Sequence, residues 1–215
     1  MFEANLADLA AGGEGTWPGY NCLPPGMPAL MTSYEPMEII VLPKTTYIRI
    51  DHIHDTVRRI FTDGRDWPKE VEPAYTGYSI GQWIDEDSDG RYDALLVETH
   101  HIKGPRAFDA SGLPLHQDDQ TVVKERIFLD QADRNILHDE ITVIDHALTR
   151  PWTVLKSYRR AAAQRPVWRE YICAEANAHV RIHDENYFLS ADGYLMPAKK
   201  DQAPPDLRYF KPARK

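Results

Sequence analysis

Cysteine is scarce in this 215-residue chain, whose two cysteines, Cys22 and Cys173, form no CxxC pair. A zinc site built on closely spaced thiolates is therefore not indicated. The sequence leaves two alternatives open: a disulfide between the N-terminal loop and the last predicted strand if the protein is exported, or two buried free thiols. The 12 glycines and 16 prolines are spread among turns, which argues against a disordered chain.

Long apolar runs and an excess of positive charge are also missing. No run approaches the roughly 18–20 residues of a membrane-spanning helix. The formal net charge is -8, from 33 acidic and 25 basic residues, which argues against a nucleic-acid-binding surface. We therefore expect a small-molecule substrate as the partner, no nucleic acid and no membrane span. Self-association into a homo-oligomer stays open.

The N-terminus has neither a basic start nor a long apolar stretch, so we expect no signal peptide. As written, the sequence predicts a cytoplasmic protein. If the sequence is a mature form that has lost a signal peptide, we expect a periplasmic protein.

Short segments of alternating polarity dominate the chain and predict an all-β fold. A short helix over residues 3–11, ended by Gly12-Gly13, precedes them. The predicted strands cover residues 37–42, 45–55, 57–62, 75–84, 92–101, 121–129, 136–146, 152–159 and 168–174. Because mostly hairpin-length loops join these strands, we predict an antiparallel up-and-down barrel of about 8–9 strands that encloses one small ligand. A two-sheet sandwich is the alternative.

The last part of the chain differs in composition from the rest. We predict a barrel domain over residues 1–178, including the N-terminal helix, and a C-terminal arm over residues 179–215 that packs on the barrel. The arm is polar, but its apolar content is too high for a free linker: it includes Tyr187, Phe188, Tyr194, Leu195, Leu207, Tyr209 and Phe210. A mobile tail is the alternative.

The strongest functional signal is the histidine pair at the end of the predicted strand 45–55. Side chains alternate faces along a strand, so His52 and His54 share a face with Ile48 and Ile50. Two imidazoles in line with an apolar face predict a cavity with proton-transfer or metal-binding chemistry at one end. The alternative is that both histidines are structural or lie at a solvated strand end.

Side chains from other strands could complete this site. Glu98 and His100 share one face of the strand 92–101, and Glu125 lies on the apolar face of the strand 121–129. An inward carboxylate could orient an imidazole, act as an acid or supply a further metal ligand. His116 is a further candidate for the metal ligand. For Glu125, a buried ion pair with Arg58 or Arg59 is an equal alternative. The predicted catalytic residues are His52, His54, Glu98, His100 and Glu125.

Arginine and aromatic side chains are the candidates for substrate binding. Arg58 and Arg59 are adjacent, so only one can point inward, where it could clamp a substrate carboxylate. An outward arginine paired with surface acids is the commoner outcome. Aromatic residues could line a pocket, although they are more often core. The predicted substrate-binding residues are Tyr47, Arg59, Tyr78, Trp83 and Trp152.

No organic cofactor is indicated, and a divalent metal remains an option. The acidic turn over residues 85–89 is superficially similar to a calcium loop. Leu96 stands where the helix-loop-helix calcium motif has its twelfth-position glutamate, so we interpret it as a solvated turn.

A set of short motifs occurs in order along the chain: Cys22–Pro28, Arg59–Arg65, Gly77–Trp83, Leu96–Thr99, Glu125-Arg126, Glu140–Val143, Arg150–Thr153 and Glu170–Cys173. Together they resemble a widespread bacterial family of functionally unassigned, often exported proteins. The similarity spans roughly residues 20–175, and no reaction is implied by it. The hairpin pattern also resembles lipocalin-type barrels, a likeness of fold that does not imply function. The DHIHD and ETHH segments and the aromatic arm depart from the family pattern.

These observations predict a cofactor-independent enzyme, a lyase, hydratase or isomerase, that uses histidine and carboxylate acid-base chemistry on a small hydrophobic or aromatic substrate inside the barrel. The alternatives are a carrier of a small hydrophobic ligand and a histidine-ligated metalloenzyme. An enzyme should place at least two titratable inward groups within hydrogen-bond reach of one another beside an open pocket. A carrier should show polar groups scattered singly in an apolar pocket.

Overall fold

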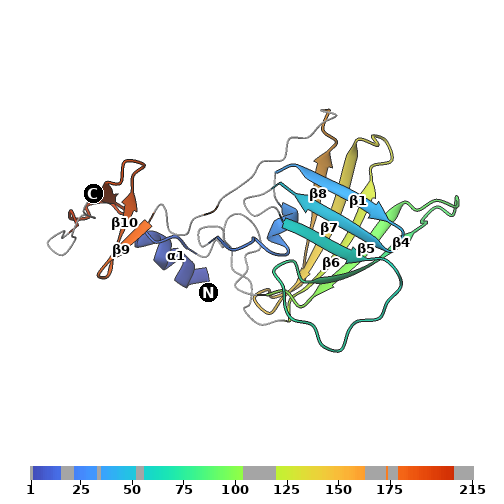
Figure 1. Ribbon diagram of the computed structural model, residues 1–215, viewed down its shortest axis with the longest axis horizontal. Coiled ribbons are helices and arrows are strands. Elements are labelled where there is room, and N and C mark those ends of the chain that lie inside the picture. The colour runs from blue at the N-terminus through green and yellow to red at the C-terminus, as the bar shows by residue number, and fades with distance from the viewer. Residues whose placement is uncertain are drawn as a thin grey trace.

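One curled, barrel-like sheet dominates the structure (Figure 1). The computed structural model describes residues 2–15, 22–32, 35–51, 56–103, 120–162, 173 and 179–205. The strands of the large sheet neighbour one another in sequence order, and the prediction of an all-β, barrel-like fold is confirmed. The strands are β1 (Met37–Leu42), β2 (Thr45–Ile50), β3 (Thr56–Phe61), β4 (Tyr78–Ile84), β5 (Ala94–His100), β6 (Val122–Leu129), β7 (Ile136–Ile144) and β8 (Trp152–Arg159).

Alternation of apolar and polar residues explains which side of each strand is buried. In β2, Ile48 and Ile50 are buried while Tyr47 and Arg49 between them are partly exposed. The same period of two runs through β3, β5, β6 and β7. The inward residues of these strands meet in one continuous core, so a strand that starts one residue out of register would turn its apolar side chains to solvent.

The pairing of β3 with β4 departs from the predicted antiparallel barrel. Among the described residues, the other neighbouring pairs of the large sheet are antiparallel, but β3 and β4 run parallel. The two strands pair only at Ile60 with Ser79 and at Phe61 with Ile80. A parallel pair needs a crossover of about a dozen residues or more, and the connection over residues 62–77 is long enough for one. The sequence-based prediction had treated the strands as antiparallel neighbours joined mostly by hairpin-length loops.

The segment before β1 packs into the core of the sheet. The 3-10 helix η2 (Ala29–Thr32) and the residue two positions before it bury Met27, Leu30 and Met31 to 1 % exposure or less. The hydroxyl of Tyr158 on β8 donates a hydrogen bond to the carbonyl of Met31. Burial of side chains of this size stabilises the fold by about 1.5–3 kcal/mol each. The segment that precedes β1 thus contributes to the core.

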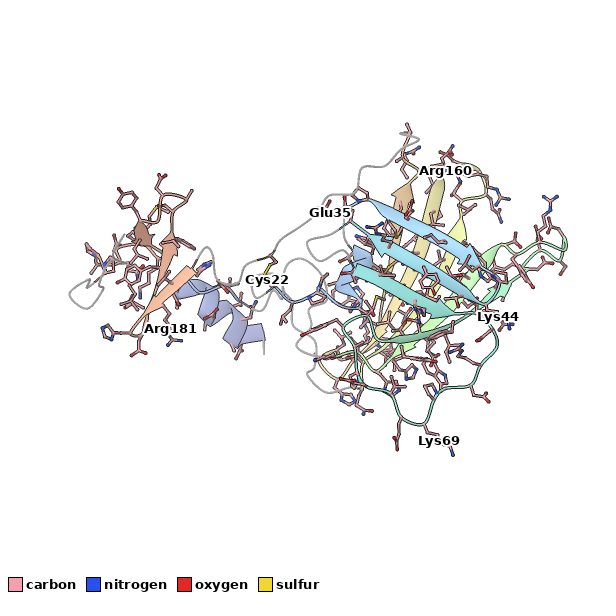
Figure 2. All side chains as sticks on the ribbon, in the orientation of Figure 1. Cys22, Glu35, Lys44, Lys69, Arg160 and Arg181 are labelled. Carbon is pink, nitrogen blue, oxygen red and sulfur yellow. A yellow bond between two sulfur atoms is a disulfide. The ribbon has the colours of Figure 1, made fainter. Side chains whose placement is uncertain are left out.

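The two ends of the chain meet in a small unit of their own. The helix α1 (Phe2–Ala10) lies beside a three-stranded sheet in the order β11-β10-β9, and the unit is separate from the large sheet in Figure 1. Figure 2 shows Arg181 in this unit and Lys44 at the β1–β2 turn of the large sheet. The additional strands are β9 (His179–Ile182), β10 (Glu185–Leu189) and β11 (Leu195–Pro197).

The contacts of this C-terminal sheet are with the N-terminal segment. The Nδ1 atom of His179 lies 3.1 Å from a carboxylate oxygen of Glu14, and Asn186 donates to the carbonyl of Ala11 over 3.4 Å. The prediction of an arm over residues 179–215 missed these strands, because they are only three to five residues long. That the arm packs on the barrel stays a prediction. The predicted strand over residues 168–174 lies outside the described residues except for Cys173.

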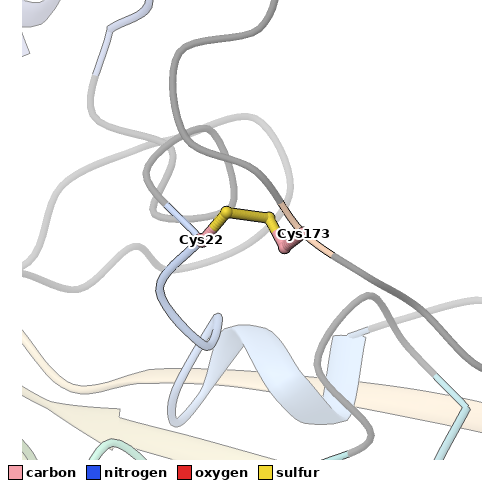
Figure 3. The surroundings of a disulfide bond; sticks show 2 residues. All are labelled: Cys22 and Cys173. Carbon is pink, nitrogen blue, oxygen red and sulfur yellow. A yellow bond between two sulfur atoms is a disulfide. The ribbon is translucent and has the colours of Figure 1, made fainter.

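The two cysteines form a disulfide, so the first of the two alternatives left open by the sequence is the observed one (Figure 3). Cys22 and Cys173 are 151 residues apart in sequence, with Cα atoms 5.7 Å apart. The bond ties the segment leading into η2 to the segment that follows β8. Structural disulfides persist in oxidising compartments, and for this reason the sequence predicted a disulfide only for an exported protein.

Candidate functional site

A buried polar cluster lies on the inward side of the large sheet and centres on Arg58. The Arg58 guanidinium is fully buried and donates to both oxygens of Glu125, with Nη1–Oε1 2.7 Å and Nη2–Oε2 2.5 Å. Its Nη2 also donates to the hydroxyl of Thr99 over 2.8 Å. The hydroxyls of Thr99 and Ser79 lie 2.8 Å apart. Four different strands, β3 to β6, therefore contribute to one hydrogen-bonded cluster.

Strand register places these groups together. Val97 is the partner of Glu125 across β5 and β6, and Ser79 is the partner of Thr99 across β4 and β5, so the side chains of each pair share a face. The buried ion pair of Glu125 with Arg58, one of the sequence-based alternatives, is confirmed. The inward arginine is thus Arg58, and Arg59 is exposed on the opposite face of β3.

Asp139 on β7 brings a second carboxyl group into the interior. It is fully buried, and within the described part of the chain neither of its oxygens has a hydrogen-bond partner. Its pKa is raised well above the ordinary value, mainly by burial and further by the negative charge of Glu125, while the positive charge of Arg58 acts against the shift. A carboxyl group in this setting favours the protonated acid. Glu125, in contrast, has both of its oxygens engaged by the Arg58 guanidinium.

The β8 side of the cluster is less enclosed than the rest. The inward residues of β8, Val154, Lys156 and Tyr158, are half-buried, whereas Arg58, Glu125 and Asp139 are buried. Burial raises the pKa of the Tyr158 phenol, and the nearby Asp139 and Glu125 raise it further. In the described residues β8 is an edge strand of the large sheet and the neighbour of β7, which carries Asp139.

Glu98 and His100 lie on the outer face of β5. The Nε2 atom of His100 is 2.6 Å from Glu98 Oε1, and Lys124 Nζ is 2.9 Å from Glu98 Oε2. Burial raises the pKa of Glu98, but the hydrogen bonds from His100 and Lys124 outweigh it and leave a lowered pKa. Because neighbouring residues of a strand point to opposite faces, this pair is separated by the sheet from the inward Glu125. Glu98 and His100 therefore lie together, but the structure does not bring them together with Glu125.

Three of the predicted substrate-binding residues do gather, but on the outer face. Tyr47, Arg59 and Tyr78 line an open groove of about 360 Å³ beside Phe61 and Gly77. The Arg59 guanidinium carbon lies 5.3 Å from the ring centre of Tyr47 and 5.9 Å from that of Phe61, within the range of cation–π attraction. This groove is therefore distinct from the interior cluster.

The two tryptophans among the predicted substrate-binding residues have different surroundings. Trp83 on β4 packs against the core, and within the described ranges its indole Nε1 has no hydrogen-bond partner. Trp152, at the start of β8, is 46 % exposed. Neither residue lines the groove.

The histidines on which the sequence-based site centred cannot be placed. His52, His54 and His116 lie outside the described residues, so their predicted roles stay predictions. Asp139 was missed, although a signal for it was present. Alternation along the strand 136–146 puts Asp139 on the same face as Leu137 and Ile141, and a charged residue on an apolar face marks a buried ionisable group.

The acidic segment over residues 85–89, after β4, forms a turn, as predicted from the sequence. The carboxylate oxygens of Asp85, Asp87 and Asp89 lie within 4.8 Å of one another. All three accept hydrogen bonds from backbone N–H groups of the turn itself, for example Gly90 N to Asp85 over 2.9 Å. These bonds hold each carboxylate in place within the turn.

Comparison of the chain with family models, with curated proteins and with solved structures finds no match. The resemblance to a bacterial family of unassigned function therefore stays a prediction. Of the helices in the described part of the chain, none has the length and apolar character needed to cross a membrane. The chemistry of the site itself is therefore the evidence for the function of the protein.

Proposed function

We propose that the protein is an acid-base enzyme that acts, without an organic cofactor, on a small neutral and largely apolar molecule inside the curled sheet. The observation that carries this proposal is Asp139, a fully buried carboxyl group without a hydrogen-bond partner in the described residues, beside the Arg58–Glu125 ion pair. An unpaired buried polar group costs free energy. A substrate that accepts a hydrogen bond from Asp139 would remove that cost.

The two inward carboxyl groups take different parts in the proposed chemistry. Asp139 is the general acid, because burial and the charge of Glu125 keep its proton in place. Glu125 has both oxygens engaged by Arg58 and is a positioning residue whose charge holds the Asp139 proton. A carboxylic acid whose pKa is raised by its surroundings is a common general acid in acid-base catalysis.

The surroundings of Asp139 indicate the type of substrate. Ile127 on β6 is its cross-strand partner, and Ile141 on β7 shares its face. A carbonyl compound or an alkene would fit this lining and accept a proton from Asp139. An anionic substrate would add a further negative charge beside Glu125. The proposed reaction is therefore that of a lyase, hydratase or isomerase, with His52 and His54 as the proposed proton acceptors or metal ligands.

A carrier of a small apolar ligand is the alternative, but the interior geometry favours the enzyme. In a carrier, polar groups would be scattered singly over an apolar wall. Arg58, Glu125 and Asp139 instead form a cluster in which the charge of Glu125 raises the pKa of Asp139. Such coupled groups are typical of catalytic sites, and they also occur in structural ion-pair networks.

Deuterium exchange tests the proposal directly. The purified protein is incubated in deuterated buffer with small cyclic ketones such as cyclohexanone and 2-cyclohexenone, and proton NMR follows the loss of signal next to the carbonyl. An acid that protonates the carbonyl promotes this exchange, so we expect the wild type to accelerate it. The Asp139→Asn variant, which keeps the shape but loses the acid, should not.

The matched control is Asp192→Asn, at an exposed turn position far along the chain, which should exchange like the wild type. Ketone signals that broaden on binding while exchange stays at the buffer rate would support the carrier. Exchange that is equally fast in the wild type and in Asp139→Asn would show that Asp139 is not the acid.

A further inference from the structure

A second constellation with catalytic geometry lies on the outer face of the sheet, where β6, β7 and β8 meet. His138 Nδ1 is 2.9 Å from the hydroxyl oxygen of Ser157, and His138 Nε2 is 3.0 Å from Asp130 Oδ2. We infer that Ser157, His138 and Asp130 form a nucleophile, base and orienting carboxylate that hydrolyse esters of short apolar acids. This site is independent of the acid-base chemistry proposed for the interior.

The strand register explains why the three side chains meet. Ser157 on β8 is the cross-strand partner of His138 on β7, and Asp130 directly follows β6. Arg160 N donates to Asn135 O, which makes the pair of residues 135 and 160 a hydrogen-bonded one. Such pairs alternate with non-hydrogen-bonded pairs, so Ser157 and His138 form a non-hydrogen-bonded pair, the kind in which side chains lie closest together.

The same alternation gives Ser157 a backbone donor for an oxyanion. In a non-hydrogen-bonded pair the backbone N–H points away from the partner strand, so the Ser157 N–H points away from β7. Among the described residues β8 is the edge of the sheet, and this N–H faces its open side. A nucleophile's own N–H is one of the donors that stabilise the tetrahedral oxyanion in acyl transfer.

The histidine is held in the tautomer that the reaction needs. The pKa of Asp130 is lowered, first by its hydrogen bond with His138 and then by the backbone N–H groups of Asp133 and Ala132. An ionised Asp130 can only accept a hydrogen bond, so Nε2 carries the proton of the neutral ring, which leaves the Nδ1 lone pair facing Ser157. The His138 side chain is 15 % exposed, and the Phe128 ring packs against it at 5.2 Å between ring centres. These contacts fix the ring.

The proposed reaction balances without a further reactant except water. The Ser157 oxygen forms a bond to the ester carbonyl carbon while its proton passes to His138 Nδ1. The bond from that carbon to the alcohol oxygen then breaks, and His138 returns the proton to the departing alcohol. Water, activated in the same way, hydrolyses the acyl-serine and releases the acid. Asp130 stays ionised throughout as a positioning residue.

The neighbours of Ser157 on its own face select the substrate. Residues two apart on a strand share a face, so Leu155 and Arg159 flank Ser157. Leu155 is 56 % exposed and offers an apolar surface to a short acyl chain. Arg159 lies 3.4 Å from the carboxylate of Asp133, so this cation already has a partner. A neutral, short-chain ester fits this surface.

Covalent labelling tests the inference. The whole protein is treated with a biotinylated fluorophosphonate, which reacts with activated serines, and the adduct is located by peptide mass spectrometry. We expect one adduct, on Ser157, and none in Ser157→Ala. In His138→Gln the labelling rate constant should fall by about 100-fold, the typical contribution of a general base. Thr153→Ala, which changes a hydroxyl on the same face of β8, should be labelled like the wild type.

Asp130→Asn tests the positioning role separately. Its Oδ1 can still accept the turn N–H groups, but its amide cannot accept from Nε2–H, so ¹⁵N NMR of His138 should show the proton moved from Nε2 to Nδ1. Slow labelling with that change supports the inference. A wild type that gives no Ser157 adduct, or a His138→Gln variant labelled at the wild-type rate, overturns it, and the first result needs no variant to fold.

Discussion

Replacing Glu125 with alanine is expected to lower the free energy of unfolding by about 3–5 kcal/mol, the usual result of breaking a buried ion pair from one side. The substitution leaves the Arg58 guanidinium fully buried without its bidentate partner. The remaining hydroxyl acceptors, Thr99 and Ser79, carry no charge to replace the carboxylate. Urea unfolding followed by circular dichroism measures the effect.

A double substitution and a surface pair control this experiment. Arg58→Met with Glu125→Leu removes both charges and should recover most of the lost stability, because two apolar side chains need no partner. The matched surface pair is Arg126 with Glu86, whose oxygen lies 2.5 Å from Arg126 Nη2 in a largely exposed setting. Glu86→Ala should cost about 1 kcal/mol or less. A Glu125→Ala variant no less stable than Glu86→Ala would contradict the description of the interior.

Asp139→Leu is expected to stabilise the protein at neutral pH by about 1–3 kcal/mol, because it removes a buried polar group that has no partner in the described residues. The gain depends on pH. The pKa of Asp139 is raised in the folded state, so its favourable contribution is complete below the unfolded pKa of about 4 and is lost as pH rises through the folded value. The stability advantage of Asp139→Leu should therefore shrink as pH falls towards 4.

Two further variants isolate the cause of this pH dependence. Asp139→Asn cannot ionise, so its stability should vary less steeply with pH than that of the wild type above about pH 4. Asp192→Asn, at an exposed turn, should leave the wild-type profile unchanged. If Asp139→Leu were less stable than the wild type at neutral pH, or if its effect were the same at all pH values, Asp139 would not be a strained buried acid.

A stabilising substitution at the proposed catalytic position would itself be informative. Proteins commonly retain destabilising buried groups where function requires them, so removal raises stability and lowers activity. Asp139→Asn provides both measurements on one variant, the pH profile of stability and the deuterium exchange.

Most of the large sheet could be predicted from sequence, because burial there follows the period of two. The strands around Ile48, Val97 and Ile141 alternate clearly. The predicted bounds of the last two agree with the structure to within two residues, whereas the strand predicted over residues 45–55 ends at Ile50. The parallel pairing of β3 with β4 could not be predicted, since it depends on how the connection over residues 62–77 returns. No local sequence pattern indicates the path of this connection.

The interior cluster was only partly predictable, for a related reason. Alternation correctly placed Glu125 inward, and adjacency showed that only one arginine of the pair could point inward. Which arginine does so depends on the starting register of β3, and one residue decides it. The link between Ser157 and His138 is also a matter of register, because 19 residues separate them in sequence.

The protonation state of Asp139 is the most direct test of the proposed interior chemistry. Carboxyl ¹³C NMR, with the Asp139 signal assigned by its loss in Asp139→Asn, follows that state as pH is changed. We predict that the signal stays at the position of a protonated acid through neutral pH, far above the ordinary aspartate midpoint of about 3.9. A signal that titrates near that ordinary midpoint would mean that Asp139 is an ionised carboxylate at neutral pH, and the proposed general acid would be lost.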